Sequence, residues 1–330
     1  SDARPVTTGS QYEVVFTDYS ALSSSSELLH RLLSPLNAMR VRQALTQSGR
    51  RLREQPIDLR QERFAVYVPP GDAPASGYAL LVFVPPWPQA TVSENFIRAL
   101  NRHRMIFVTA AHSGNDSNVM DRRIPLALLA EQNIVRHYRV DPRRVFVGGL
   151  SGGSRVALRI ALAYPDVFHG ALLNAGSDPI GDAQMSVPPA DLFRRFQQAT
   201  RLVYLTGGRD QFNLDADALS RRSLQHWCVF DVANESKTMP WAGHQLADPV
   251  ALDAALAALE KPVPPDPGKL ADCRSRIDRE LATQEQRLGK LAASGKADAA
   301  RAVLDRIDTR FGGLAAAQSL RWMDALRAKP

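Results

Sequence analysis

The stretch Arg143–Leu162 reads RRVFVGGLSGGSRVALRIAL and changes character in its middle. Residues 145–148 are apolar or glycine, as in a buried strand, and the residues from Ser154 onward have helical spacing. Between them lies GLSGG, residues 149–153. Glycines on both sides of Ser151 allow a sharp, strained turn, so the sequence predicts a strand-to-helix turn that presents the serine hydroxyl.

This position of Ser151 suits nucleophilic chemistry. A serine hydroxyl is a weak nucleophile at neutral pH and needs an adjacent base. The start of a helix supplies backbone N–H groups and a positive dipole end, which stabilise a developing oxyanion. The alternative is a glycine-rich turn that serves only close packing.

The base is expected later in the chain, and His244 is the best candidate. It lies in the loop PWAGHQLAD, residues 240–248, and follows the expected last strand. The other histidines lie in or beside expected helices and strands, except His112. His112 follows an expected strand, VTAA, and we expect it to line the site.

The acid that orients the histidine is predicted to be Asp210. It follows an apolar strand and a Gly-Gly turn in LTGGRDQFN, residues 205–213. Such an acid holds the imidazole in the correct tautomer and stabilises its charged form. Asp215, Asp217 and Asp231 are competitors, and a simple turn residue is the alternative for Asp210.

Strands alternate with helices from the middle of the chain onward, which is typical of a parallel sheet covered on both faces. Strands are expected at residues 12–17, 63–70, 78–86, 105–111, 143–149, 170–176, 201–208 and 226–232. Helices are expected at residues 124–137, 154–164, 191–199 and 250–259. A helical insertion, about residues 24–52, opens with capping-box spacing at Ser24 and Glu27.

The segment EKPVPPDPG, residues 260–268, is expected to be a stiff linker because prolines cannot continue a helix. Beyond it, two apolar stripes at helical spacing predict a helical hairpin followed by a last short helix. The stripes are Leu270, Ile277, Leu281, Leu288, Leu291 and Val303, Leu304, Ile307, Phe311. We expect a first domain, residues 1–262, and a linker with helical hairpin, residues 263–330, that packs on it and could dock a partner.

Composition narrows the function classes. The 330 residues are 45% hydrophobic with a net charge of +7, and the basic residues are scattered without interleaved aromatics. That pattern argues against nucleic-acid binding, while an acidic substrate or a negatively charged cell envelope stays compatible with it. No apolar run has the length of a membrane span.

The two cysteines, Cys228 and Cys273, do not form a CxxC pair, so zinc or thioredoxin-like chemistry is not expected. They form either one disulfide or two separate buried thiols. The chain does not begin with methionine, which fits a removed leader or a trimmed start. We expect a secreted or periplasmic protein.

With Ser151, Asp210 and His244 in that order, the stretch from Arg63 to Leu259 resembles the α/β-hydrolase superfamily, most closely the polyhydroxybutyrate-depolymerase and feruloyl-esterase type. In that family the third strand ends in His-Gly, and the next residue donates a backbone N–H to the oxyanion. Here VFVPPWPQ, residues 82–89, has Pro-Pro instead, and Trp87 takes the donor position.

The resemblance implies an α/β fold and a serine esterase that works through an acyl-enzyme, with Trp87 and Gly152 as oxyanion donors and no metal or organic cofactor. The alternatives are a serine peptidase of the same fold and an inactive binding protein. The gap of residues 177–200 leaves no room for a helical lid. We therefore expect an open cleft for short or bulky, polymer-attached esters, lined by Trp87, Trp241 and His112.

Overall fold

The computed structural model describes residues 6–328 and contains an eight-stranded sheet of order β1-β2-β4-β3-β5-β6-β7-β8. The strands are β1 (Gly9–Val14), β2 (Phe64–Val68), β3 (Tyr78–Val84), β4 (Met105–Ala110), β5 (Val140–Leu150), β6 (Gly170–Asn174), β7 (Arg201–Leu205) and β8 (Val232–Asn234). β2 runs antiparallel to both its neighbours, β1 and β4, and all other neighbours are parallel. The predicted mostly parallel sheet is confirmed.

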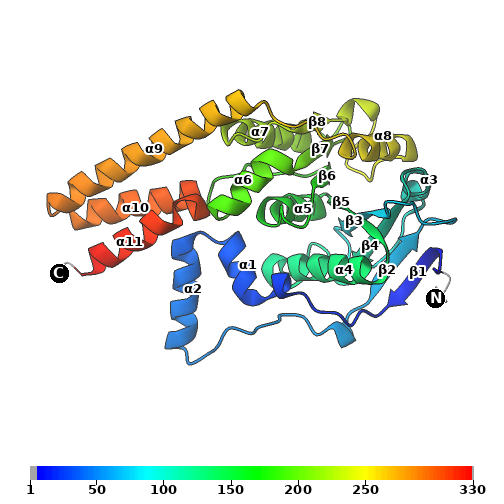
Figure 1. Cartoon of the computed structure of the whole chain (residues 1–330), viewed down its shortest axis with the longest axis horizontal. Helices are drawn as coiled ribbons and strands as arrows, with labels where there is room; N and C mark the ends of the chain where they lie inside the picture. The colour runs from blue at the N-terminus through cyan, green and yellow to red at the C-terminus, as the bar shows by residue number, and fades with distance from the viewer. Residues whose placement is uncertain (1–5, 329–330) are drawn as a thin grey trace.

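Helices cover both faces of the sheet, as Figure 1 shows. Two of them, α3 (Glu94–His103) and α8 (Pro249–Leu259), pack together on one face. The other face carries α4 (Ile124–His137), α5 (Gly152–Ala163), α6 (Ala190–Ala199) and α7 (Gln211–His226). Side chains of β3 alternate between the two layers, with Leu80 and Val82 in one core cluster and Leu81 and Phe83 in the other. This is the pattern of a strand buried on both faces.

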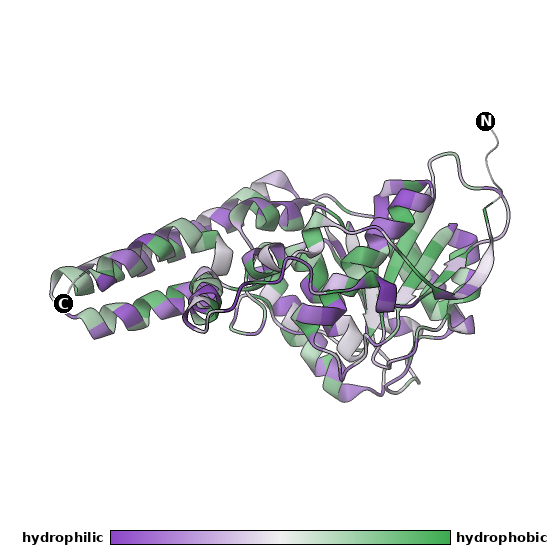
Figure 2. Cartoon of the chain, turned by 90° about the horizontal axis from the view of Figure 1, so that it is seen from below, coloured by the Kyte–Doolittle hydropathy of each residue, from purple (hydrophilic) through white to green (hydrophobic). Residues whose placement is uncertain are grey.

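Five further helices lie outside the sheet layers. The insertion before β2 forms α1 (Ser25–Leu32) and α2 (Pro35–Gln47), and the Ser24 hydroxyl caps α1 by accepting from the Glu27 N–H. The C-terminal helices are α9 (Pro267–Ala293), α10 (Ala297–Phe311) and α11 (Ala316–Arg327). Figure 1 shows α9 and α10 as a hairpin that extends away from the sheet, and Figure 2 shows this helical extension, with the C-terminus at its far end, from below. Short helical turns complete the chain: η1 (Ala21–Ser23), η2 (Leu59–Gln61), η3 (Val119–Arg123), η4 (Ser236–Thr238) and η5 (Gly312–Ala315).

The base of this hairpin is fixed to the rest of the molecule. The Asp308 carboxylate accepts hydrogen bonds from the Ser34 hydroxyl, at 2.5 Å, and from the Leu36 N–H, at 3.1 Å. The Phe311 ring packs edge-on against Trp227. A disulfide joins Cys228 to Cys273 on α9. The two apolar stripes are thus buried at their inner ends against the sheet-bearing part of the chain.

Two local predictions differ from the structure. The strand expected at residues 226–232 is wrong, because Trp227, Cys228 and Val229 follow the end of α7 and fill the core, and β8 begins only at Val232. The expected first strand, residues 12–17, lies three residues earlier, at β1. Within residues 6–328, no helix is both long and apolar enough to cross a membrane.

Candidate active site

Ser151 occupies the sharp turn between β5 and α5. Its φ of 57° and ψ of −121° are strained for a residue with a side chain. A Cβ on Gly149 would overlap the Gly153 backbone, and a Cβ on Gly153 would overlap the Val84 carbonyl. Only glycines fit at these two positions, so the turn can close and leave the Ser151 side chain at the end of the sheet.

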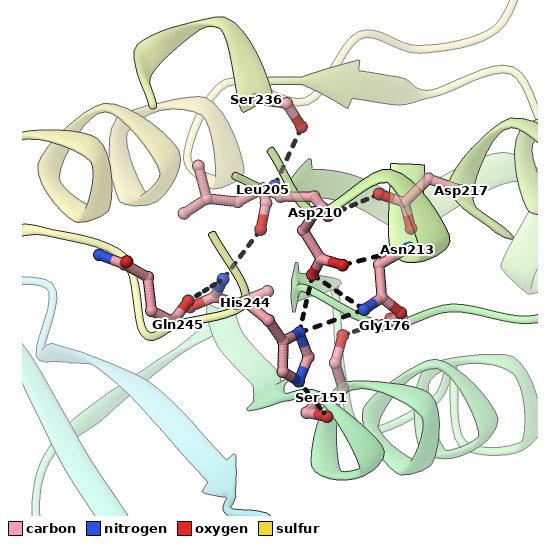
Figure 3. Close-up of polar contacts among 12 residues, drawn as sticks. Ser151, Gly176, Leu205, Asp210, Asn213, Asp217, Ser236, His244 and Gln245 are labelled. Atoms are coloured by element: carbon pink, nitrogen blue, oxygen red, sulfur yellow. Dashed lines mark hydrogen bonds and ion pairs between the residues drawn. The ribbon is translucent and has the colours of Figure 1, made fainter. Parts of the chain in front are cut away.

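The structure brings Ser151, His244 and Asp210 together from three separate loops (Figure 3). Oγ of Ser151 lies 2.9 Å from Nε2 of His244, and Nδ1 of His244 lies 2.7 Å from Oδ2 of Asp210. The carboxylate is buried, whereas the imidazole is half exposed. In this arrangement, Nδ1–H donates to Asp210, and Nε2 is left to accept the proton of the serine hydroxyl.

Two glycines allow the loops of Asp210 and His244 to meet. A Cβ on Gly207 would overlap the carbonyls of Ala242 and Gly243, and a Cβ on Gly208 would overlap the Pro240 backbone. The Arg209 N–H donates to the Ala242 carbonyl at 2.9 Å. The turn after β7 and the loop before His244 therefore lie backbone against backbone.

Asn174, at the end of β6, connects the serine to the histidine loop, and no sequence signal singled it out. Its carbonyl accepts the Ser151 N–H at 2.9 Å, and its side-chain oxygen accepts the Ala247 N–H at 2.9 Å. Its amide nitrogen donates to the Leu205 carbonyl at 2.9 Å. All polar groups of this fully buried side chain are thus used to align three strand ends.

Asn213 was also missed and lies against Asp210. Its Nδ2 donates to Oδ2 of Asp210 at 2.9 Å, and Arg155 Nη2 donates to its Oδ1 at 2.9 Å, which fixes the orientation of the amide. Burial alone would raise the pKa of Asp210, but hydrogen bonds from His244 and Asn213 hold it below its ordinary value. Asp210 is therefore ionised where its role requires a carboxylate.

The competing acids lie elsewhere. Asp217 accepts hydrogen bonds from Ser177 and Thr206, and Asp231 forms an ion pair with Arg201. Asp215 binds Gln211 on the surface of α7. Of the four candidate acids, Asp210 alone contacts His244 among the described residues.

The two expected oxyanion donors lie on adjoining elements. Gly152 is the first residue of α5, and its N–H is one of the donors that a helix start leaves unpaired. Trp87 lies in the loop after β3, and the Asn115 N–H holds this loop by donating to the Pro86 carbonyl at 2.9 Å. Their role in holding an oxyanion stays a prediction.

The expected substrate-binding residues differ in exposure. Trp241 is 76% exposed, and Trp87 is half-buried against the α3–α8 side of the core. His112 is exposed, with a positive φ of 52°, and its N–H donates to the Pro88 carbonyl.

No helix forms between β6 and α6, so this connection adds no helical lid within the described chain. Within residues 6–328, no group of three or more His, Cys, Asp or Glu side chains could hold a metal ion.

No protein-family model matches the sequence, and no curated protein matches it. Solved structures of similar fold include a ferulic acid esterase, 15% identical over 60% of this chain and 92% of that chain, with a TM-score of 0.44. A poly(3-hydroxybutyrate) depolymerase from Bordetella parapertussis is 18% identical over 64% of this chain and 88% of that chain, with a TM-score of 0.43. An esterase from Thermogutta terrifontis is 15% identical over 62% and 88%, with a TM-score of 0.44.

The protein has the α/β-hydrolase fold. The strand order, the antiparallel β2 and the turn at Ser151 define this fold, and the resemblance seen in the sequence is confirmed at that level. A fold alone does not determine an activity, which depends on the residues of the site.

Proposed function

We propose that the protein is a serine esterase that cleaves carboxylic esters through an acyl-enzyme. The observation that carries the proposal is the series Ser151 Oγ, His244 and Asp210, joined at 2.9 and 2.7 Å. His244 Nε2 accepts the hydroxyl proton while Oγ attacks the ester carbonyl carbon. The imidazolium then protonates the leaving alcohol, and a water deprotonated by His244 releases the acid.

In this proposal the remaining groups stabilise charge and position the ring. Asp210 holds the Nδ1 proton and stabilises the imidazolium that forms. The N–H groups of Trp87 and Gly152 would donate to the oxyanion of the tetrahedral intermediate. The exposed Trp241 supports a cleft open to bulky or polymer-attached esters, with Trp87 and His112 as further contacts.

We also propose that the protein is exported to an oxidising compartment, outside the cell or in a periplasm. The Cys228–Cys273 disulfide supports this location, because disulfides persist mainly in secreted and periplasmic proteins.

Labelling with a fluorophosphonate tests the esterase mechanism, together with turnover of short-chain 4-nitrophenyl esters. We expect label and turnover in the wild type, and a loss of at least about 10³-fold in kcat in Ser151→Ala and His244→Ala. Ser48→Ala, an exposed serine at the end of α2, is the matched control. Labelling that persists in Ser151→Ala would place the nucleophile elsewhere. Faster cleavage of aminoacyl amides than of esters would indicate a peptidase.

A further inference from the structure

A cavity of about 420 Å³ reaches Gly152, the residue directly after Ser151. On α5 the cavity is lined by Gly152, Arg155, Val156, Arg159, Leu162 and Ala163. Spacings of three and four place these residues on one face of the helix. A helix rises 1.5 Å per residue, so this face is about 15 Å long. The cavity is thus an elongated pocket that begins beside the candidate nucleophile.

The apolar residues of the other walls are aliphatic. Leu32 and Leu33 come from the end of α1, Met120 from η3, and Met185 from the loop after β6. None of the described residues that line the cavity is aromatic. The volume lies in the lower part of the usual range for ligand pockets. Such walls fit a flexible aliphatic chain better than a flat ring.

The cavity is also rich in arginine. Arg155 Nε and Arg159 Nη1 lie 3.5 and 2.9 Å from the two oxygens of Asp178, so two guanidinium groups share one carboxylate. Both arginine side chains are less than a quarter exposed. Arg31, a third lining arginine, already has its own carboxylate partners outside the lining. Arg155 and Arg159 together therefore carry one positive charge more than Asp178 neutralises.

A fourth lining arginine, Arg123, has no carboxylate partner among residues 6–328. It is 4% exposed and donates to the Ser113 and Pro85 carbonyls, both at 2.9 Å. Burial lowers the pKa of Arg123 to about 10, opposed only by the charge of Asp116, so the group stays charged at neutral pH. The charge of Arg123 adds to the positive potential of the cavity, which favours an anionic ligand over a neutral one of the same shape.

We propose that this cavity binds an aliphatic acyl chain that ends in a carboxylate, so that half-esters of dicarboxylic acids are the preferred substrates. This rests on the esterase function proposed above. The ester carbonyl would lie at Gly152, the chain along Val156 and Met120, and the distal carboxylate toward Arg159. Arg159 is seven residues beyond Gly152, about 10 Å along α5, and its side chain leans back toward the helix start, which suits a chain of about six carbons.

The test compares two esters that share the same six-carbon acyl chain: the 4-nitrophenyl half-ester of adipic acid and the same ester with its free carboxylate methylated. Rates with Ser151→Ala are subtracted as background, because a free carboxylate can promote spontaneous hydrolysis. We expect kcat/KM to favour the charged ester by at least about tenfold in low salt, and the preference to shrink as salt is added.

Arg159→Gln should remove most of this preference through KM, and Arg159→Glu should reverse it. The matched control is Arg143→Gln, which alters an exposed arginine near the opposite end of β5 and should keep the preference. Thermal unfolding verifies that each variant is folded. Equal kcat/KM for the two esters, or a preference retained in Arg159→Glu, overturns the proposal. A stronger preference for an ester with the carboxylate on its alcohol part overturns the acyl assignment.

Failure of the esterase function is distinguishable from failure of this inference. If neither ester is hydrolysed, the esterase proposal fails, and calorimetric titration of the intact protein with adipate and hexanoate still tests the cavity. Adipate binding that is tighter than hexanoate binding and weakened in Arg159→Gln supports the anion site. No adipate binding overturns it.

Discussion

Asn213 donates a hydrogen bond of 2.9 Å to Oδ2 of Asp210, the same oxygen that lies 2.7 Å from Nδ1 of His244. Asn213 Nδ2 is also 3.2 Å from that ring nitrogen. When Nδ1 carries its proton, both nitrogens are donors, so both point at the one carboxylate oxygen. Asn213 thereby fixes the rotation of Asp210, and Asp210 fixes the ring.

We therefore predict that Asn213→Ala lowers kcat of the proposed esterase by about 10- to 100-fold with little change in KM, because misplacement of a catalytic group by about 1 Å costs on the order of 100-fold. The pKa of Asp210 should also rise toward its ordinary value of 3.8, since the ionised form loses a donor. The stability that ionised Asp210 contributes would then be lost at a higher pH on acidification. Acid unfolding curves and steady-state kinetics measure the two effects.

Gln211→Ala is the control for this change, because Gln211 lies in the same first turn of α7 but faces solvent and donates to Asp215. If Asn213→Ala instead raises KM and leaves kcat unchanged, Asn213 acts on substrate binding and not on the position of Asp210.

The glycines near His244 should differ sharply in their tolerance of a methyl group. Gly207→Ala would drive a Cβ into the Ala242 and Gly243 carbonyls, so we predict a destabilisation of about 1–3 kcal/mol and a large loss of activity. Gly243→Ala should change little, although Gly243 is adjacent to His244, because nothing lies within 4 Å of its added Cβ. Thermal unfolding and ester turnover of the pair check this. Equal effects of the two substitutions would show that the contact between the loops does not hold the site.

The salt bridge around His103 should make stability depend on pH. Its ring nitrogens lie 3.0 Å from Glu260 and 3.0 Å from Asp253, both on or next to α8. The hydrogen bond to Glu260 raises the pKa of His103 above 6.5, and burial opposes this only in part. A raised folded-state pKa gives stability that is complete below pH 6.5 and is lost as pH rises through the folded-state value.

We predict that His103→Gln lowers the free energy of unfolding by more at pH 5.5 than at pH 9, as measured by urea unfolding at both pH values. His137→Gln is the control, because that exposed histidine contacts a single carboxylate, Asp18, among residues 6–328. A loss in His103→Gln that is the same at both pH values would show that packing, and not charge, stabilises the α3–α8 pair.

The elements that could be predicted from sequence are those whose packing follows a regular apolar pattern. The continuous apolar runs of β3 and β4 are buried on both faces. The turn at Ser151 could be recognised in the sequence because only glycine fits at positions 149 and 153. Ser151, Asp210 and His244 could be selected because each follows a strand or lies in a late loop. The structure then brings them together.

The helix α7 was missed because its buried face is largely polar. Its buried residues are Asn213, Asp217, Ser220 and Leu224, at helical spacing, but three of these four are not apolar. Asp217 faces the Ser177 and Thr206 hydroxyls, which satisfy it after the chain has folded. Such polar pairs join residues that are separated in sequence, so hydrophobic periodicity does not predict them. The polar contacts of Asn174 could not be predicted for the same reason.

The last prediction concerns the disulfide between Cys228 and Cys273, which closes a loop of 45 residues. Cys228 follows α7 and Cys273 lies in the second turn of α9, so the bond fixes the base of the helical hairpin. Because a cross-link of this span restricts the unfolded chain, Cys273→Ser should lower the free energy of unfolding by about 2–4 kcal/mol. A reducing agent should lower the Tm of the wild type toward that of the variant and leave the Tm of the variant unchanged. A Tm of the wild type that is indifferent to reduction would mean that Phe311, Trp227 and Asp308 fix the hairpin without help from the disulfide.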